Sequence, residues 1–183
     1  YDRLVSFGTK TTETGGVSYD YSVIEPEIAE SWEITPEAMT FKLRPEGKFH
    51  DGTPITAADV KWSFDRAVSL GGFPAVQMEN TDQFEAIDDL TFRIKLLRPS
   101  KLTLPDLAVP VAIVINSKVA IANATDDDPW ATEYLHKTPA GSGAFKVARW
   151  NPGEQLVYDA NAEYTSGAVP AVKRVILREV PSP

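Results

Sequence analysis

Apolar and polar residues alternate along several short stretches of the chain, which is the period of a half-buried β-strand. Residues 40–44 (TFKLR) and residues 91–96 (TFRIKL) each place their apolar side chains on one face. The second stretch follows residues 84–87 across Asp88 and Asp89, and aspartate favours tight turns. We therefore expect two strands, with a hairpin and an acidic turn before the second.

A helical period replaces this alternation from residue 56 onward. The Thr56 hydroxyl can cap the first turn, and Asp59 three residues later can return the bond and complement the helix dipole. Gly71 and Gly72 follow, and glycine suits the left-handed conformation that ends many helices. We expect a helix between them, with a core-facing stripe that consists of Val60, Phe64, Ala67 and Val68.

The remaining patterns are shorter. Together with the strands and the helix above, they predict the α+β class, with mixed or antiparallel sheets and flanking helices. Glycines and a proline at 138–143 mark a turn or a crossing between subdomains. We expect Trp32 and Trp150 in the core, because their apolar area favours burial. The further expected elements are an amphipathic segment at 102–107, strands at 111–115, 145–150, 155–159 and 172–180, and helices near 117–123 and 130–136.

Composition and charge exclude several classes of function. The chain has 183 residues and a net charge of −8, and an acidic chain repels the phosphate backbone of nucleic acids, so we expect no nucleic-acid partner. Pro110 interrupts the longest apolar run, at 109–115, so no stretch approaches the roughly 20 apolar residues that span a bilayer. The absence of cysteine excludes disulfides and thiol catalysis.

The two ends lack the features of natural termini. Residue 1 is a tyrosine, with no initiator methionine and no charged-then-apolar signal segment. At the other end, the expected strand at 172–180 stops shortly before Pro181 and Pro183. We expect the chain to be a fragment of a longer protein.

His50 and Asp51 are adjacent and precede the predicted helix cap at Asp59. Imidazole and carboxylate groups suit acid-base chemistry and metal binding, so a metal-assisted hydrolase that uses His50, Asp51 and Asp59 is one hypothesis. The alternative is a loop turn in which Asp51 bonds its own backbone and Gly52 has a positive φ. His136 is the only other histidine, which is too few for a zinc site of usual spacing, so we expect no metal.

Two other patterns suggest further alternatives. The apolar run at 109–115 could form the exposed edge strand of an interaction module, which predicts dimers in solution. The turn formed by Gly141, Ser142 and Gly143 lacks the following Lys-Ser or Lys-Thr pair of a phosphate-binding loop. We expect this turn to have a structural role.

Ordered blocks of sequence resemble a known family. Residues 26–33 (PEIAESWE), 48–64 (KFHDGTPITAADVKWSF), 142–147 (SGAFKV) and 161–164 (NAEY) resemble the signature of family 5 extracellular solute-binding proteins, in that family's order. The chain departs from the family at Ala144, where the family usually has a proline. It also departs at 165–167 (TSG), where the family has a tryptophan and glycines and this chain keeps a single glycine. The blocks cover nearly the whole chain.

The resemblance implies the receptor component of a bacterial ABC importer, which acts in the periplasm or elsewhere outside the cytoplasm and is not an enzyme. Its expected partners are a solute and a membrane permease, with no cofactor. The blocks resemble the peptide-binding members most, so we expect di- or oligopeptides; nickel chelates, opines and oligosaccharides are the alternatives. The implied fold is part of the first lobe of a type II periplasmic-binding-protein clamshell.

The same resemblance implies a division of the chain and a set of ligand contacts. Residues 1–137 would form the accessory subdomain of the first lobe, starting near residue 7, and 138–183 part of its core sheet, with the second lobe absent. The expected ligand-binding residues are Phe73 in the loop at 71–76, Tyr19 and Tyr21 in the Gly-rich loop after Thr12, and Ser142 at the lobe junction.

Overall fold

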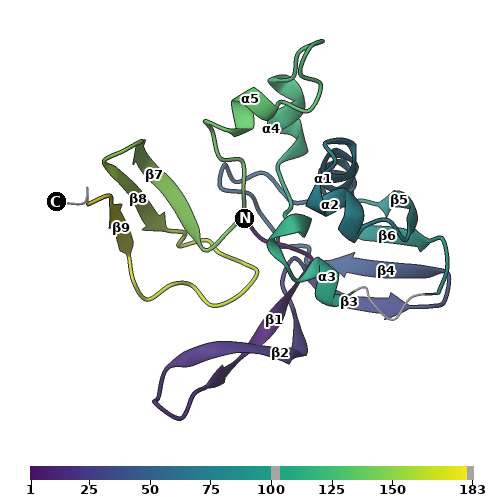
Figure 1. The fold of residues 1–183 in the computed structure, drawn as a ribbon, viewed down its shortest axis with the longest axis horizontal. Helices are drawn as coiled ribbons and strands as arrows, with labels where there is room; N and C mark the ends of the chain where they lie inside the picture. The colour runs from purple at the N-terminus through teal and green to yellow at the C-terminus, as the bar shows by residue number, and fades with distance from the viewer. Residues whose placement is uncertain (100–103, 181–183) are drawn as a thin grey trace.

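The computed structural model describes residues 1–99 and 104–180, whose arrangement Figure 1 shows. Its strands form three sheets, β1–β2, β3–β4–β6–β5 and β7–β8–β9, and all of these pairs are antiparallel. The strands are β1 (Val5–Thr11), β2 (Val17–Pro26), β3 (Ala29–Ile34), β4 (Ala38–Leu43), β5 (Thr81–Asp88), β6 (Thr91–Leu96), β7 (Phe145–Asn151), β8 (Gln155–Ala160) and β9 (Arg174–Arg178). The helices are α1 (Ala57–Ser69), α2 (Phe73–Gln77), α3 (Leu104–Leu107), the 3-10 helix η1 (Pro110–Ala112), α4 (Ser117–Ala122) and α5 (Thr132–Leu135).

The main core lies between the four-stranded sheet and α1. Phe41 on β4 is paired with Phe92 on β6, and both side chains are fully buried. The ring centroid of Phe64 on α1 lies 5.3 Å from those of Phe84 and Phe92. Such edge-to-face packing adds to the stabilisation from hydrophobic burial. The two predicted strands and the hairpin between β5 and β6 are confirmed.

Helix α1 begins and ends as the sequence predicts. Asp59 Oδ2 accepts hydrogen bonds from Thr56 N at 2.9 Å and from the Thr56 hydroxyl at 2.7 Å. Gly71 follows the helix with a φ of +75°. The predicted core stripe is correct in the first half of α1 and wrong for Val68, which is 38% exposed, because the last turn extends past the packed surface. Within 1–99 and 104–180, no helix has both the length and the apolar character needed to cross a membrane.

The apolar run at 109–115 does not form the predicted strand. Pro110 begins η1, and the chain that follows is extended but pairs with no strand in the described part of the protein. Proline lacks the backbone donor that a sheet requires, which disfavours a strand here. Val114 and Ile115 are buried, with 0% and 5% exposure. The run therefore supplies Ala112, Val114 and Ile115 to the core and forms no exposed edge strand, so the interaction module predicted from such an edge loses its basis.

Other predicted elements differ in their ends. Strand β9 is shorter than the predicted stretch at 172–180, and α5 is shorter than the predicted helix at 130–136. Ala131 has a left-handed φ of +50°, so the helix cannot begin before it. Residues 102 and 103 of the predicted amphipathic segment lie outside the described residues. The predictions of α4, β7 and β8 are confirmed to within about two residues.

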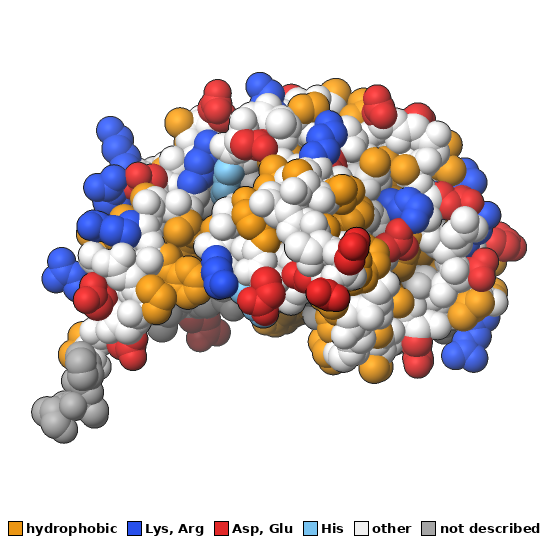
Figure 2. All heavy atoms as spheres, turned by 90° about the horizontal axis from the view of Figure 1, so that it is seen from above, with side chains coloured by type: hydrophobic (Ala, Val, Ile, Leu, Met, Phe, Trp, Pro, Cys, Tyr) orange, Lys and Arg blue, Asp and Glu red, His pale blue; other side chains and the backbone are white. Residues whose placement is uncertain are grey.

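The three-stranded sheet leaves apolar side chains uncovered on one face. Trp150, Leu156 and Leu177 form one cross-strand row, in which Trp150 is 50% and Leu177 is 54% exposed. Figure 2 shows hydrophobic side chains gathered at the left end of the molecule, where Figure 1 places β7, β8 and β9. The prediction that Trp150 lies in the core is wrong, because none of the described helices covers this row. Trp32, by contrast, is half-buried against the main core.

Candidate functional site

A cavity of about 520 Å³ lies where the N-terminal residues meet the three-stranded sheet. Its wall combines the first two residues, the connection between β2 and β3, the turn before β7, the two strands β8 and β9, and the loop between them. Four aromatic rings and two carboxylates contribute to this wall. The lining residues are Tyr1, Asp2, Glu27, Gly143, Ala144, Phe145, Tyr158, Tyr164 and Val175.

Asp2 is the more deeply buried of the two carboxylates, with 3% exposure. Its Oδ1 accepts a hydrogen bond from the Tyr164 hydroxyl at 3.4 Å, whereas its Oδ2 has no partner in the described part of the chain. Burial raises the pKa of Tyr164, and the negative charges of Asp2 and Glu27 raise it further. The phenol therefore keeps its proton and remains a donor to Asp2.

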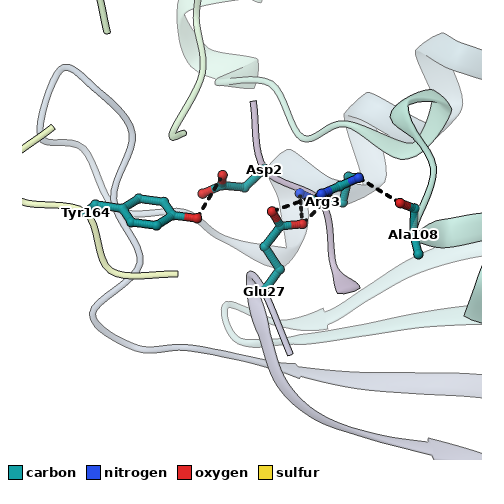
Figure 3. Close-up of polar contacts among 5 residues, drawn as sticks. All are labelled: Asp2, Arg3, Glu27, Ala108 and Tyr164. Carbon is teal, nitrogen blue, oxygen red and sulfur yellow. Dashed lines mark hydrogen bonds and ion pairs between the residues drawn. The ribbon is translucent and has the colours of Figure 1, made fainter. Parts of the chain in front are cut away.

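Arg3 holds the second carboxylate of the wall, Glu27. Arg3 Nε donates to Glu27 Oε2 at 3.0 Å, and Arg3 Nη1 donates to the Ala108 carbonyl oxygen at 2.7 Å (Figure 3). Burial raises the pKa of Glu27, while the Arg3 guanidinium opposes that change by favouring the charged form. Figure 3 shows the guanidinium directed toward Glu27 and the Ala108 carbonyl group and away from Asp2, so its ion pair is with Glu27.

His50 links the loop before α1 to the turn before β7. Its backbone N donates to the Gly141 carbonyl oxygen at 2.8 Å, and its Nε2 lies 2.8 Å from the Gly143 carbonyl oxygen. Lys146 Nζ donates to the His50 carbonyl oxygen at 3.2 Å. Burial lowers the pKa of His50, which favours a neutral ring that donates through Nε2. Because Gly143 lines the cavity, His50 helps to position one part of its wall.

Asp51 and Asp59 have structural partners. Asp51 Oδ1 accepts a hydrogen bond from Thr53 N at 2.9 Å, and Gly52 has a φ of +86°, so the predicted loop turn is confirmed. Asp59 Oδ1 accepts bonds from Ser117 N at 3.1 Å and from the Ser117 hydroxyl at 2.6 Å, in addition to the helix-cap bonds of its Oδ2. Within the described residues, no group of three His, Cys, Asp or Glu side chains could hold a metal ion.

The four predicted ligand-binding residues lie on different elements. Phe73 is 63% exposed and begins α2 instead of lying in a loop, because Pro74 favours the first turn of a helix. Tyr19 and Tyr21 lie in strand β2, paired with β1, and not in the predicted loop; they are 55% and 70% exposed, with ring centroids 6.2 Å apart. Ser142 is 2% exposed. Only Tyr19 and Tyr21 come together, and none of the four lines the cavity.

Asp2 and Tyr164 are cavity residues that the sequence does not single out. Tyr164 belongs to the block at 161–164 that resembles the family, which is a signal that could have drawn attention to it. Asp2 has no comparable signal, because its partner Tyr164 is 162 residues away in the chain. Such a pair becomes visible only in the folded protein.

Comparisons with known proteins agree with the predicted resemblance. The family model described as "Bacterial extracellular solute-binding proteins, family 5 Middle" matches residues 23–183. The chain is 37% identical over 180 residues to "Probable D,D-dipeptide-binding periplasmic protein DdpA" of Escherichia coli (strain K12), covering 97% of this chain and 33% of that protein. It is 30% identical to "Di/tripeptide-binding protein 4" of Pseudomonas aeruginosa (strain UCBPP-PA14), covering 93% and 33%.

Solved structures show the same fold. The periplasmic binding protein DppA from Helicobacter pylori in complex with peptide STSA has a TM-score of 0.79 and 28% identity, covering 99% of this chain and 37% of that one. MoaA from A. tumefaciens R10 in complex with mannopinic acid has a TM-score of 0.81 and 29% identity, covering 98% and 34%. This chain spans about a third of the length of the relatives it matches. It belongs to family 5 of the bacterial extracellular solute-binding proteins.

Proposed function

We propose that the chain contributes to the ligand-binding wall of a receptor for di- or oligopeptides, which serves an ABC importer outside the cytoplasm. The observation that carries this proposal is the 37% identity, along 97% of the chain, to a protein named as D,D-dipeptide-binding and periplasmic. The fold match to a binding protein solved with a peptide supports the same ligand class.

In this proposal the chain belongs to one lobe of a clamshell that closes around its ligand by hinge motion. Residues 1–137 form the accessory subdomain, starting near residue 7, and 138–183 contribute to the core sheet. The closed receptor delivers its ligand to a membrane permease. One wall alone leaves the ligand open to water, so we expect residues 1–183 in isolation to bind peptide weakly or not at all.

We also propose that the chain acts by binding alone, without catalysis. The rival hypothesis of a metal-assisted hydrolase requires free side chains at His50, Asp51 and Asp59. Both oxygens of Asp59 are instead engaged by the helix cap and by Ser117. His50 Nε2 faces the Gly143 carbonyl oxygen, and Asp51 holds its own turn. These contacts support a structural role for all three residues.

The predicted ligand contacts remain part of the proposal. Phe73, Tyr19 and Tyr21 offer exposed rings that could cover an apolar ligand group when the lobes close. Ser142 is buried beside Gly143, so its contribution would come through the shape of that turn. Replacing each aromatic residue by alanine in turn should weaken peptide binding, as measured by titration calorimetry. Unchanged affinity in all three variants would remove them from the site.

A thermal-shift panel on the intact polypeptide that contains these residues tests the ligand class. The probes are D-Ala-D-Ala, an L-dipeptide, an L-tetrapeptide, mannopinic acid, a nickel–histidine chelate and a trisaccharide. A ligand at about a hundred times its dissociation constant adds about 2.7 kcal/mol to the free energy of unfolding. We expect a shift with at least one peptide and none with the trisaccharide. If no peptide shifts the transition, the proposed peptide receptor is wrong.

An opine receptor is the second candidate, because the fold match to a protein solved with mannopinic acid has a TM-score of 0.81. A shift with mannopinic acid and with no peptide would favour it over the first candidate.

A further inference from the structure

We propose that strand β2 is a self-association surface, through which two copies of this protein pair edge to edge in an antiparallel, two-fold arrangement centred on Asp20. The strand belongs to the β1–β2 hairpin, which extends away from the rest of the molecule in Figure 1. Within the described residues, β2 pairs with β1 and with no other strand. One of its edges is therefore open to a further strand.

The first observation is the symmetry of the β2 sequence. Residues 17–23 read VSYDYSV, which is the same in both directions. When two copies pair antiparallel with Asp20 at the centre, valine faces valine, serine faces serine and tyrosine faces tyrosine. The facing pairs are Val17 with Val23, Ser18 with Ser22, and Tyr19 with Tyr21 of the second copy. A two-fold interface requires a surface that is complementary to itself, and this strand meets that requirement.

The second observation is the exposed apolar row on the same strand. Val17, Tyr19, Tyr21 and Val23 are all exposed, and the ring centroids of the two tyrosines lie 6.2 Å apart. Apolar residues that alternate with polar ones are typical of a strand with one buried face, yet this row is uncovered in the described part of the chain. Cross-strand aromatic pairs stabilise a sheet, so a second copy would gain from placing each Tyr19 opposite a Tyr21.

The third observation is the incomplete backbone pairing of β2. The register with β1 shifts between Phe7 and Gly8, so residues 21–23 have no partner on β1. The Ser22 amide donates instead to Asp20 Oδ1, at 3.0 Å. A two-stranded hairpin on its own is only marginally stable in water, and the unpaired backbone groups of an edge strand are a template for another strand. Pairing with a second copy would satisfy groups that the hairpin leaves open.

Asp20 limits the strength of this association. At the two-fold centre its carboxylate faces the same carboxylate of the second copy, and like charges directly opposite each other destabilise a strand pair. Charged residues are a common means by which edge strands restrict association. Residues 17–23 are also far fewer than the roughly 20–30 residues a side of stable interfaces. We therefore expect a weak dimer that added salt strengthens, because ions screen the repulsion.

Sedimentation equilibrium of the intact polypeptide that contains these residues measures the association. We expect a monomer–dimer equilibrium that Asp20→Asn tightens by about two- to fivefold, because asparagine removes the charge and keeps an oxygen for the Ser22 amide. The matched control is Glu13→Gln, which removes the same charge in the turn between β1 and β2 and should leave the dissociation constant unchanged. Tyr19→Ser removes both tyrosine pairs and should weaken the dimer at least about fivefold.

Cysteine crosslinking tests the register independently of these affinities. Residues 1–183 contain no cysteine, so an introduced thiol is read against an unmodified wild type. Opposite residues of antiparallel strands have Cα atoms about 4.5–5.5 Å apart, which a disulfide can bridge. On oxidation with copper phenanthroline, we expect Asp20→Cys to form a covalent dimer and Lys10→Cys, on β1, to remain monomeric. Ser18→Cys and Ser22→Cys should crosslink efficiently only when the two variants are mixed.

Four outcomes would overturn the proposed dimer. They are a monomer at every concentration, no crosslink in Asp20→Cys, equal effects of Asp20→Asn and Glu13→Gln, and crosslinking of Ser18→Cys alone as strong as in the mixture. The first two together would show that another part of the intact polypeptide covers the edge of β2. Oligomeric state and peptide affinity are separate readouts, so each of these outcomes leaves the proposed peptide receptor untouched.

Discussion

The four-stranded and the three-stranded sheets of this protein share the same alternation of apolar and polar residues but differ in what covers them. Helix α1 covers the first, where Phe41 and Phe92 are fully buried. In the second, Trp150 and Leu177 are half exposed. Because hydrophobic stabilisation scales with the apolar area removed from water, the first sheet should dominate the free energy of unfolding. Alternation identifies residues that share a face, and packing decides whether that face is buried.

The largest expected effect lies at the contact between α1 and the four-stranded sheet. Phe64→Ala removes a ring that is 1% exposed and that meets Phe84 and Phe92. We expect the free energy of unfolding to fall by about 3–5 kcal/mol, because the lost burial adds to the cost of a cavity. Denaturant titration of the intact polypeptide measures this. A loss below about 1 kcal/mol would show that the contact does not dominate stability.

A smaller effect is expected at the cap of the same helix. Asp59→Ala removes the acceptor for the Thr56 and Ser117 donors and should cost about 1–3 kcal/mol. Asp65→Ala is the matched control on the same helix, because Asp65 forms only a partly exposed pair with Lys61. It should change the free energy of unfolding by at most about 0.5 kcal/mol. Equal effects of the two substitutions would contradict the structural role of Asp59.

The free energy of unfolding should depend on pH through His50, which joins the loop before α1 to the turn before β7. Its folded pKa is lowered by burial below the unfolded value of about 6.5, so the unfolded state binds more protons as the pH falls. The stabilisation is complete above pH 6.5 and is lost as the pH falls toward the folded pKa. Lys146 lowers the pKa of His50 further, whereas Asp2 raises it. In His50→Gln the melting temperature should fall less steeply with decreasing pH than in the wild type; identical profiles would count against this contribution.

The smallest effect is expected on the uncovered face of the three-stranded sheet. Trp150→Ser replaces a side chain that is 50% exposed, and we expect a change within about 0.5 kcal/mol. Val157→Ala, on the same sheet but only 3% exposed, should cost more. If Trp150→Ser proves as costly as Phe64→Ala in the intact polypeptide, another part of that polypeptide covers this face.

Much of the fold was predictable because its determinants are local. The cap at Thr56 and Asp59, the hairpin turn at Asp88 and Asp89, and the positive φ of Gly71 each depend on residues within a few positions of one another. The strand predicted at 111–115 failed because Pro110 outweighed the apolar run. The candidate site was less predictable: the exposed aromatic residues could be proposed from the sequence, whereas the Asp2 cavity could not.

The sequence by itself determined the family, the α+β class and the main capped helix, because short-range periodicity and ordered motifs carry that information. Only the tertiary structure decided that Asp2 meets Tyr164, that Arg3 pairs with Glu27, and that His50 contacts the turn at Gly143. These contacts join residues 24 to 162 positions apart. Their existence depends on how the sheets pack together, which no local pattern of side chains records.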